Sequence, residues 1–231
     1  MQLTNPANAT TMTMFAQKTA EVLTRLSHLK VVPVLVLDTV ETGMKMCELL
    51  VENGLPAAEI TFRTAAAEET IRRAAREFPA LTLGAGTVLN CEVLHRAIDA
   101  GASFAVAPGF NPTVVKEAIK CGFPFVPGIA TPSELEQAYE LGCSFLKFFP
   151  AEANGGVKML KNLLAPYRQL GIRFMPTGGV TPALLQSYLE IPEIACVGGT
   201  WLAKGADLKQ AADSGDWSAI AKGIADTVAA I

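Results

Sequence analysis

Histidine is scarce in this chain, which has only His28 and His95 among its 231 residues. The sequence has no HExxH motif and no carboxylate cluster at the spacing of metal ligands. Because a catalytic zinc ion usually takes histidine among its three protein ligands, this scarcity argues against a metal-dependent reaction. Both histidines fall in helical patterns and are interpreted as structural.

The chain also lacks the features of membrane, secreted and nucleic-acid-binding proteins. No apolar run reaches the roughly 18 residues of a membrane span, and residues 1–14 lack the basic start and apolar stretch of a signal peptide. A net charge of −3 offers no basic surface for nucleic acid. The cysteines form no CxxC motif, as is typical of reduced thiols in the cytoplasm; they are Cys47, Cys91, Cys121, Cys143 and Cys196. We therefore expect a cytoplasmic protein without membrane or nucleic-acid partners.

Short apolar runs are abundant, and they recur at intervals of roughly 20 to 29 residues, the period of a strand followed by a helix. The eight runs are Val31–Leu37, Ala58–Phe62, Leu81–Ala85, Ser103–Ala107, Phe123–Val126, Phe145–Phe149, Arg173–Pro176 and Ile194–Gly198. They predict an α/β protein with a single-domain (β/α)8 TIM barrel over residues 15–231. A doubly wound open sheet is the alternative, but no GxGxxG follows the first run.

Helical patterns lie between these runs. Apolar spacing over residues 15–28 predicts an extra N-terminal helix, which we expect to cover the N-terminal mouth of the barrel. Residues 1–14 are expected to form a polar segment outside the domain. Three helices are predicted to begin with an N-cap residue before proline: Asn111-Pro112, Thr131-Pro132 and Thr181-Pro182. Thr131 with Glu134 also predicts a capping box.

The most informative residue is Lys147, which stands in the middle of the apolar run 145–149. Because side chains alternate along a strand, Phe145, Lys147 and Phe149 share one face. A lysine is almost never fully buried unless it is paired. Burial disfavours the charged ammonium, so such a lysine becomes a nucleophilic amine more readily. The alternative is a strand-end lysine that extends its ammonium to water.

In a barrel enzyme the active site lies at the carboxyl ends of the strands. The second strand is predicted to end at residues 59–63, where Glu59, Thr61 and Arg63 would share the inward face. An inward carboxylate and guanidinium form either a structural ion pair or an acid/base beside an anion-binding group. Thr87 offers a hydroxyl at the rim after the third strand.

Glycine pairs follow the seventh and eighth strands, as Gly178-Gly179 and Gly198-Gly199. Barrel enzymes commonly hold phosphate at these two loops with backbone N–H groups. Turns also need glycine, so it is the paired occurrence that favours an anion site. Together with an inward lysine and glutamate, this pattern indicates Schiff-base chemistry on a phosphorylated carbonyl substrate.

Four motifs carry a resemblance to a known family, and their order and spacing are specific. They are Glu59-Ile60-Thr61-Phe62-Arg63-Thr64, Gly84-Ala85-Gly86-Thr87-Val88, Lys147-Phe148-Phe149-Pro150-Ala151-Glu152 and Pro176-Thr177-Gly178-Gly179. From about Val31 to about Gly205, the chain resembles the 2-keto-3-deoxy-6-phosphogluconate (KDPG) and 4-hydroxy-2-oxoglutarate aldolase family. The resemblance implies a metal-independent class I aldolase without a cofactor. It would cleave the keto-acid phosphate KDPG to pyruvate and glyceraldehyde 3-phosphate, a step of the Entner–Doudoroff pathway, and 4-hydroxy-2-oxoglutarate to pyruvate and glyoxylate. The resemblance also implies a homotrimer.

By motif, the resemblance assigns Lys147 as the Schiff-base lysine and Glu59 as the general acid/base. The implied substrate contacts are Arg63 and Thr87 for the pyruvyl carboxylate, Phe149 and Thr177 along the pocket, and Gly178, Gly179, Gly199 and Thr200 for the phosphate. Many relatives carry an arginine near the end of the first strand, where this chain has Val36. Two alternatives stay open: decarboxylation of oxaloacetate through the same imine, and a non-catalytic phosphate-sugar-binding barrel. The second would need neither Lys147 nor Glu59.

Overall fold

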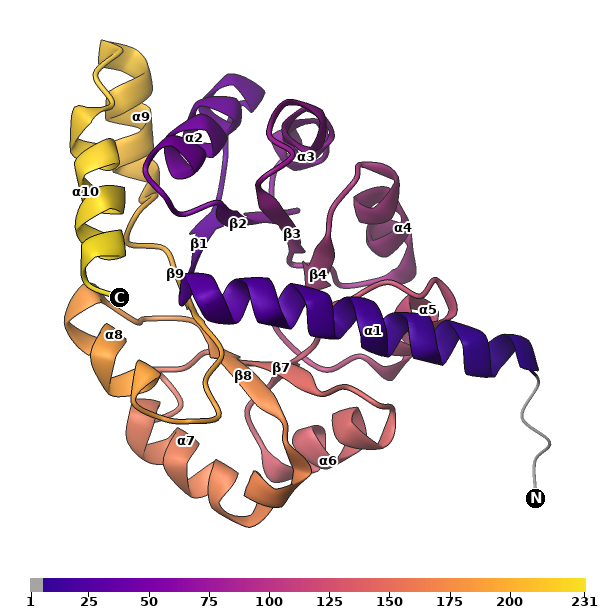
Figure 1. The fold of residues 1–231 in the computed structure, drawn as a ribbon. Helices are drawn as coiled ribbons and strands as arrows, with labels where there is room; N and C mark the ends of the chain where they lie inside the picture. The colour runs from indigo at the N-terminus through magenta and orange to yellow at the C-terminus, as the bar shows by residue number, and fades with distance from the viewer. Residues whose placement is uncertain (1–5) are drawn as a thin grey trace.

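The computed structural model describes residues 6–231 (Figure 1), in which strands and helices alternate along the chain. The strands are β1 Val31–Leu35, β2 Ala57–Thr61, β3 Thr82–Gly86, β4 Phe104–Val106, β5 Phe125–Val126, β6 Gly128–Ile129, β7 Phe145–Phe148, β8 Arg173–Pro176 and β9 Val197–Gly199. The helices are α1 Pro6–Leu29, α2 Val40–Glu52, α3 Ala66–Glu77, α4 Cys91–Asp99, α5 Pro112–Lys120, α6 Pro132–Glu140, α7 Gly156–Leu164, α8 Pro182–Leu189, α9 Gly205–Ser214 and α10 Ser218–Ala229, with a 3-10 helix at Ala165–Leu170. Each predicted apolar run overlaps a strand, and the predicted α/β class is confirmed. Among the described helices, none has both the length and the apolar character that a membrane span requires.

All strand pairs are parallel, and they form two curled sheets. The larger sheet has the order β5-β4-β3-β2-β1-β9, and the smaller has the order β6-β7-β8. The predicted fifth strand, Phe123–Val126, overlaps β5 alone. Pro127 ends β5, because proline lacks the backbone N–H that a ladder needs, and the short strand β6 follows it beyond the predicted run. Single parallel bridges, Phe174 with Ile194 and Thr177 with Gly198, connect the β8 region to the β9 region.

Helix α1 begins at Pro6, well before the predicted start at residue 15. Residues 6–14, expected to form a polar segment outside the domain, therefore belong to this helix. The sequence pattern misses the start because most of residues 9–14 are exposed and show no apolar spacing, whereas Phe15, Val22 and Leu26 are buried.

Two apolar clusters make up the core. The larger fills the space between the strands and the surrounding helices. The smaller joins Val22 and Leu26 of α1 to Val32, Phe104 and Phe145, which stand first or second in their strands. Helix α1 therefore packs across the amino ends of the strands, as Figure 1 shows. The carboxyl ends are left for polar side chains.

Two of the three predicted helix starts have the expected cap. The Asn111 side chain accepts a hydrogen bond from the backbone N–H of Thr113 at 3.0 Å. Thr131 and Glu134 form the predicted capping box at the start of α6. The Thr181 side chain makes no such hydrogen bond, although Pro182 begins α8 as predicted.

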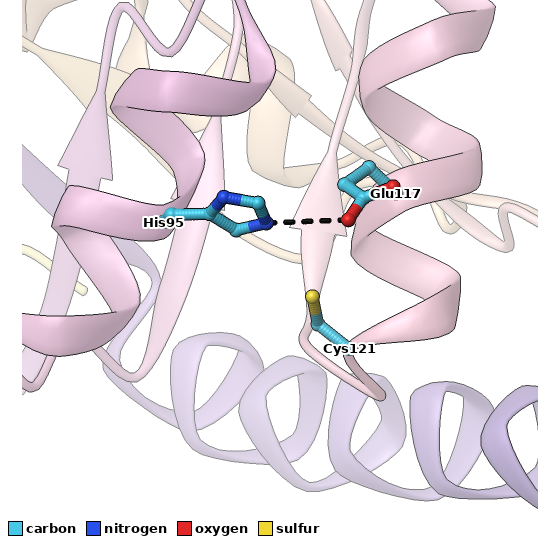
Figure 2. Close-up of side chains that lie close together, drawn as sticks. All are labelled: His95, Glu117 and Cys121. Atoms are coloured by element: carbon cyan, nitrogen blue, oxygen red, sulfur yellow. Dashed lines mark hydrogen bonds and ion pairs between the residues drawn. The ribbon is translucent and has the colours of Figure 1, made fainter.

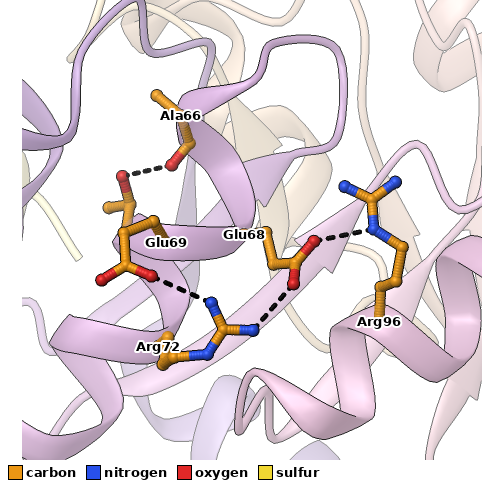
Figure 3. A network of polar contacts seen from close by, with 6 residues as sticks. Ala66, Glu68, Glu69, Arg72 and Arg96 are labelled. Carbon is orange, nitrogen blue, oxygen red and sulfur yellow. Dashed lines mark hydrogen bonds and ion pairs between the residues drawn. The ribbon is translucent and has the colours of Figure 1, made fainter.

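Charged side chains connect α3 to α4 on the outside of the fold (Figure 3). Glu68 binds Arg72 and Arg96, each at 2.7 Å, and these two guanidinium groups lower the pKa of its carboxyl. Arg96 also lies 5.6 Å from the ring centre of Phe62, the first residue after β2. The network therefore braces the turn that follows β2, where a candidate substrate residue lies.

Candidate active site

Lys147 and Glu59 meet in the interior, although 88 positions separate them in the chain. Lys147 lies in β7 of the smaller sheet and Glu59 in β2 of the larger one. The Lys147 Nζ donates to Glu59 Oε1 at 3.1 Å and to Oε2 at 3.3 Å. Relative exposure is 5% for Lys147 and 1% for Glu59. The alternative of a lysine that extends to water is therefore wrong, and the inward orientation predicted for both residues is confirmed.

This pair has the geometry of a nucleophile beside its proton acceptor. Two charges taken out of water compensate each other only when they are in contact, and a carboxylate at hydrogen-bond distance can accept the proton of the amine. Among residues 6–231, Lys147 is the only buried lysine. Its Nζ lies 5.3 Å from the ring centre of Phe149, which closes one side of the amine's surroundings.

A glycine at the end of β3 makes room for the Glu59 carboxylate. Gly86 pairs with Thr61 in the parallel ladder of β2 and β3. A Cβ atom at Gly86 would lie 2.7 Å from the Glu59 Cγ and would overlap its Oε1. A side chain at position 86 could not occupy that space without displacing the carboxylate. Because Gly86 has no side chain, the Glu59 carboxylate can lie where it contacts Lys147.

We expect Gly86→Ala to reduce catalysis strongly while the protein remains folded. The added methyl would push the Glu59 carboxylate away from Lys147, and small displacements of a catalytic group cost on the order of 10²-fold in rate. Steady-state turnover measures this effect. Gly205→Ala is the matched control, because a Cβ there meets no atom within 4 Å. Equal turnover in the two variants would show that Glu59 tolerates displacement.

The structure separates Arg63 from the other residues expected on its face. Strand β2 ends at Thr61, so Arg63 lies in the following turn and is exposed. Thr61 is buried and donates from its hydroxyl to the Leu35 carbonyl at 3.0 Å. The prediction of an inward Arg63 on the strand is therefore wrong, because the strand pattern was continued two residues too far. Arg63 stands at the rim instead.

Thr87 is half-buried directly after β3 and has a φ angle of +60°. This left-handed conformation is rare for a β-branched residue. Such strain of about 1–3 kcal/mol is maintained only when the surroundings impose it, and it is concentrated at functional sites. The backbone conformation of Thr87 therefore indicates a functional role, and this indication is not visible in the sequence.

The loops after β8 and β9 lie at the same end of the strands as Lys147. Thr177 is buried, and Gly178 and Gly179 both have positive φ angles, +101° and +81°. Thr200 is exposed after β9, whereas Gly199 is buried because the Trp201 ring occupies the place that a Cβ would take. Within residues 6–231, no hydrogen bond is donated by the backbone N–H of Gly179 or Thr200.

Glu152 and Tyr188 support the Gly178-Gly179 loop, and no sequence pattern indicates this pairing. The Glu152 backbone N–H donates to the Gly178 carbonyl at 3.0 Å, and a Cβ at Gly179 would lie 2.8 Å from the Glu152 Cβ. The buried Tyr188 hydroxyl of α8 donates to the Glu152 carboxylate. Burial, and then this carboxylate, raise the pKa of Tyr188, which therefore stays protonated. The loop is thus held between the segment after Lys147 and helix α8.

The volume of a cavity does not identify the active site in this structure. A cavity of about 820 Å³ lies at the opposite end of the strands, where α1 contributes Arg25 and His28 and the strand starts contribute Pro56 and Thr82. Its walls contain no nucleophile paired with a base. The chemistry of Lys147 and Glu59, rather than volume, identifies the active site.

A model of the KDPG and KHG aldolase family matches residues 22–222. The chain belongs to the KDPG and KHG aldolase family. It is 42% identical over 210 residues to the 2-dehydro-3-deoxy-phosphogluconate aldolase of Haemophilus influenzae, which covers 91% of this chain and 96% of the relative. The aldolase family suspected from the four motifs is confirmed.

Two solved aldolase structures share this fold. KDPG aldolase from Legionella pneumophila, with pyruvate captured as a covalent carbinolamine, has a TM-score of 0.80 at 34% identity over 86% of this chain and 93% of its own. The aldolase of Zymomonas mobilis with 3-phosphoglycerate has a TM-score of 0.80 at 35% identity over 90% and 96%. A carbinolamine forms when an amine adds to a carbonyl carbon, which is the step that an aldolase lysine performs.

Proposed function

We propose that this protein is a class I aldolase that cleaves KDPG to pyruvate and glyceraldehyde 3-phosphate through a Schiff base on Lys147. The observation that carries the proposal is the buried contact between Lys147 and Glu59, which joins a nucleophile to an acid/base. A non-catalytic phosphate-sugar-binding protein would have no need of this pair. The reaction belongs to the Entner–Doudoroff pathway.

The geometry supports a sequence of proton transfers around one amine. Glu59 takes a proton from the Lys147 ammonium, and the free amine attacks the keto carbon of the substrate to give a carbinolamine. Glu59 returns this proton to the carbinolamine hydroxyl, which leaves as water. The protonated imine that results accepts the electrons of the breaking C3–C4 bond. Glu59 accepts the proton of the C4 hydroxyl, the aldehyde leaves, and Glu59 then protonates the enamine. Water releases pyruvate and restores the amine. Acid–base assistance of this kind contributes about 10²–10⁴-fold.

Groups at the carboxyl ends of the strands would hold the substrate. We assign Arg63 and Thr87 to the pyruvyl carboxylate, because one brings a guanidinium and the other a hydroxyl to the rim after β2 and β3. Phe149 and Thr177 would line the pocket beside Lys147. The ring of Phe149 is already next to the amine, and Thr177 is buried directly after β8.

The phosphate would lie on the loops after β8 and β9. Gly178 and Gly179 form one of these loops, and the unpaired backbone N–H groups of Gly179 and Thr200 suit an anion. Helix α8 begins three residues after Gly179. Gly199 would contribute by letting the chain pass close to the Trp201 ring. Unphosphorylated 4-hydroxy-2-oxoglutarate would react with the same lysine without binding to the phosphate loops. We therefore propose it as a second substrate of this protein.

The decisive assay compares the turnover of phosphorylated and unphosphorylated substrates by the unaltered protein and by variants of the Gly178-Gly179 loop. We expect turnover of KDPG, measured as pyruvate release, to exceed turnover of 4-hydroxy-2-oxoglutarate. Gly179→Val should reduce KDPG turnover far more than the exchange of pyruvate methyl protons in D₂O, because pyruvate carries no phosphate. The valine would clash with Glu152 and strain a residue at φ +81°, so it would displace the cradle. Gly179→Ala is the milder form of the same change.

Gly215→Ala is the matched control for backbone strain, since Gly215 has a φ of +74° but no atom within 4 Å of a Cβ. Equal losses of both activities in folded Gly179→Val would remove the support for a phosphate cradle at this loop. No pyruvate release from either substrate would contradict the proposed function as a whole.

We further infer that the two curled sheets close into one (β/α)8 barrel. The continuity of β5 and β6 through Pro127 and the bridges between the β8 and β9 regions support closure, and the Lys147–Glu59 contact spans the two sheets.

A homotrimer and a cytoplasmic location are also proposed. The location is supported by five cysteines without a disulfide in the described chain and by the bacterial aldolase relatives.

A further inference from the structure

Three side chains with metal-binding atoms converge on the outer surface, away from the aldolase site (Figure 2). His95 lies on α4, and Glu117 lies on α5 with Cys121 at its C-cap. Because Glu117 and Cys121 are four positions apart, they project from the same face of α5. The His95 Nε2 is 3.2 Å from the Glu117 Oε1, and Figure 2 shows the Cys121 thiol directed toward this contact.

The distances suit a small divalent cation. The imidazole nitrogen, the carboxylate oxygen and the sulfur all lie within 4.8 Å of one another. Zinc bonds of roughly 2.0–2.3 Å at tetrahedral angles place ligand atoms about 3.3–3.8 Å apart. The His95–Glu117 separation is already close to this value, and rotation of the exposed Cys121 side chain would close the rest. Nitrogen, sulfur and carboxylate oxygen are the ligand types that zinc prefers.

Charged neighbours determine whether the Glu117 carboxyl and the Cys121 thiol carry a proton before a metal ion binds. Lys120 donates to Glu117 Oε2 at 2.9 Å and, with a smaller effect from His95, lowers the pKa of the Glu117 carboxyl. Glu117 is therefore ionised and offers Oε1 on the side of His95. Burial, followed by the Glu117 charge, raises the pKa of the Cys121 thiol. A metal ion would thus replace the thiol proton: the S–H bond breaks, a sulfur–metal bond forms and the proton goes to solvent.

We propose that His95, Glu117 and Cys121 form a surface site for a zinc-type divalent transition-metal ion, with water as the fourth ligand. The ion would join α4 to α5 on the outside of the fold. Lys147 and Glu59 lie inside, so occupancy of this site leaves aldol cleavage unchanged. The site is independent of the proposed function.

Metal titration of the full chain tests the site. The protein is treated with EDTA, desalted and titrated with Zn²⁺ against a chromophoric chelator, and separately with Co²⁺. We expect one ion per chain, and a thiolate-to-cobalt charge-transfer band with the intense d–d bands of tetrahedral Co²⁺. His95→Ala, Glu117→Gln and Cys121→Ser should each weaken binding at least about tenfold, since even the loss of an outer hydrogen bond to a metal ligand costs 10–100-fold. Cys121→Ser should also remove the charge-transfer band.

Variants nearby separate this site from general metal binding. Cys91→Ser changes a different thiol, at the start of α4, which is not part of the cluster. His28→Ala removes the other histidine, and both variants should bind Zn²⁺ as the unaltered chain does. Lys120→Gln should tighten binding, because it removes the cation that competes for Glu117. The proposal is overturned if Co²⁺ gives no thiolate band, if the stoichiometry is below one, or if Cys91→Ser weakens binding as much as Cys121→Ser. Loss of aldol cleavage on EDTA treatment, restored by Zn²⁺, would overturn the independence of the two sites.

Discussion

Lys147→Ala is expected to abolish aldol cleavage and to prevent covalent capture of pyruvate. In the unaltered chain, sodium borohydride with pyruvate should reduce the imine, so we expect the intact mass to rise by one reduced pyruvyl group and peptide mapping to place that group on Lys147. The reason is burial beside a base: within the described chain, no other lysine is shielded from water and bound to a carboxylate in this way. The expected loss is complete, because no neighbouring amine can replace the Nζ.

The alanine variant needs a folding control, since removing one member of a buried ion pair costs about 3–5 kcal/mol of stability. Lys147→Met keeps the apolar stem without the amine, so a folded but inactive methionine variant separates chemistry from stability. Lys158→Ala removes an exposed lysine of α7 and should retain both cleavage and adduct. An adduct on a lysine other than Lys147 would reassign the nucleophile.

The parts of this site that the sequence predicts are those that follow from strand periodicity. Alternation along the run 145–149 places Lys147 inward, and the same rule places Glu59 inward from β2. Their contact joins two strands that are not neighbours in the sheets, and only inward side chains of a curled sheet can make it. The sequence thus indicates which residues face the interior. It does not measure how closely they approach.

Other features depend on where elements end and on which helices become neighbours. Arg63 was expected on the inward face of β2, but periodicity has no information on the residue at which pairing stops. Glu152 and Tyr188 are 36 positions apart, and His95 and Glu117 are 22 apart. Their side chains meet only because consecutive helices pack side by side or because α8 returns to the loop after β7. No local pattern encodes such contacts.

Glu59→Gln is expected to fold normally and to lose turnover by about 10²–10⁴-fold, the usual contribution of a general acid–base group. The amide has nearly the same shape, and its oxygen can accept a hydrogen bond from Lys147 Nζ at the position of Oε1 or Oε2. It cannot take or return a proton. The exchange of pyruvate methyl protons should fall together with cleavage, since both require proton transfer at the enamine. Steady-state kinetics and D₂O exchange measured on the same preparation provide the comparison.

Glu59→Asp distinguishes proton transfer from a purely electrostatic role. The shorter carboxylate keeps the charge that compensates the Lys147 ammonium but withdraws by about one bond length, so partial activity above that of the glutamine variant is expected. Near-normal turnover in folded Glu59→Gln would contradict the acid/base assignment and leave Glu59 as the counter-ion of a buried lysine. Thr61→Val, on the same buried strand, changes a hydroxyl whose hydrogen bond goes to the Leu35 carbonyl rather than to Lys147. It should therefore retain both activities, which ties the effect at position 59 to the group that contacts the amine rather than to any polar change in β2.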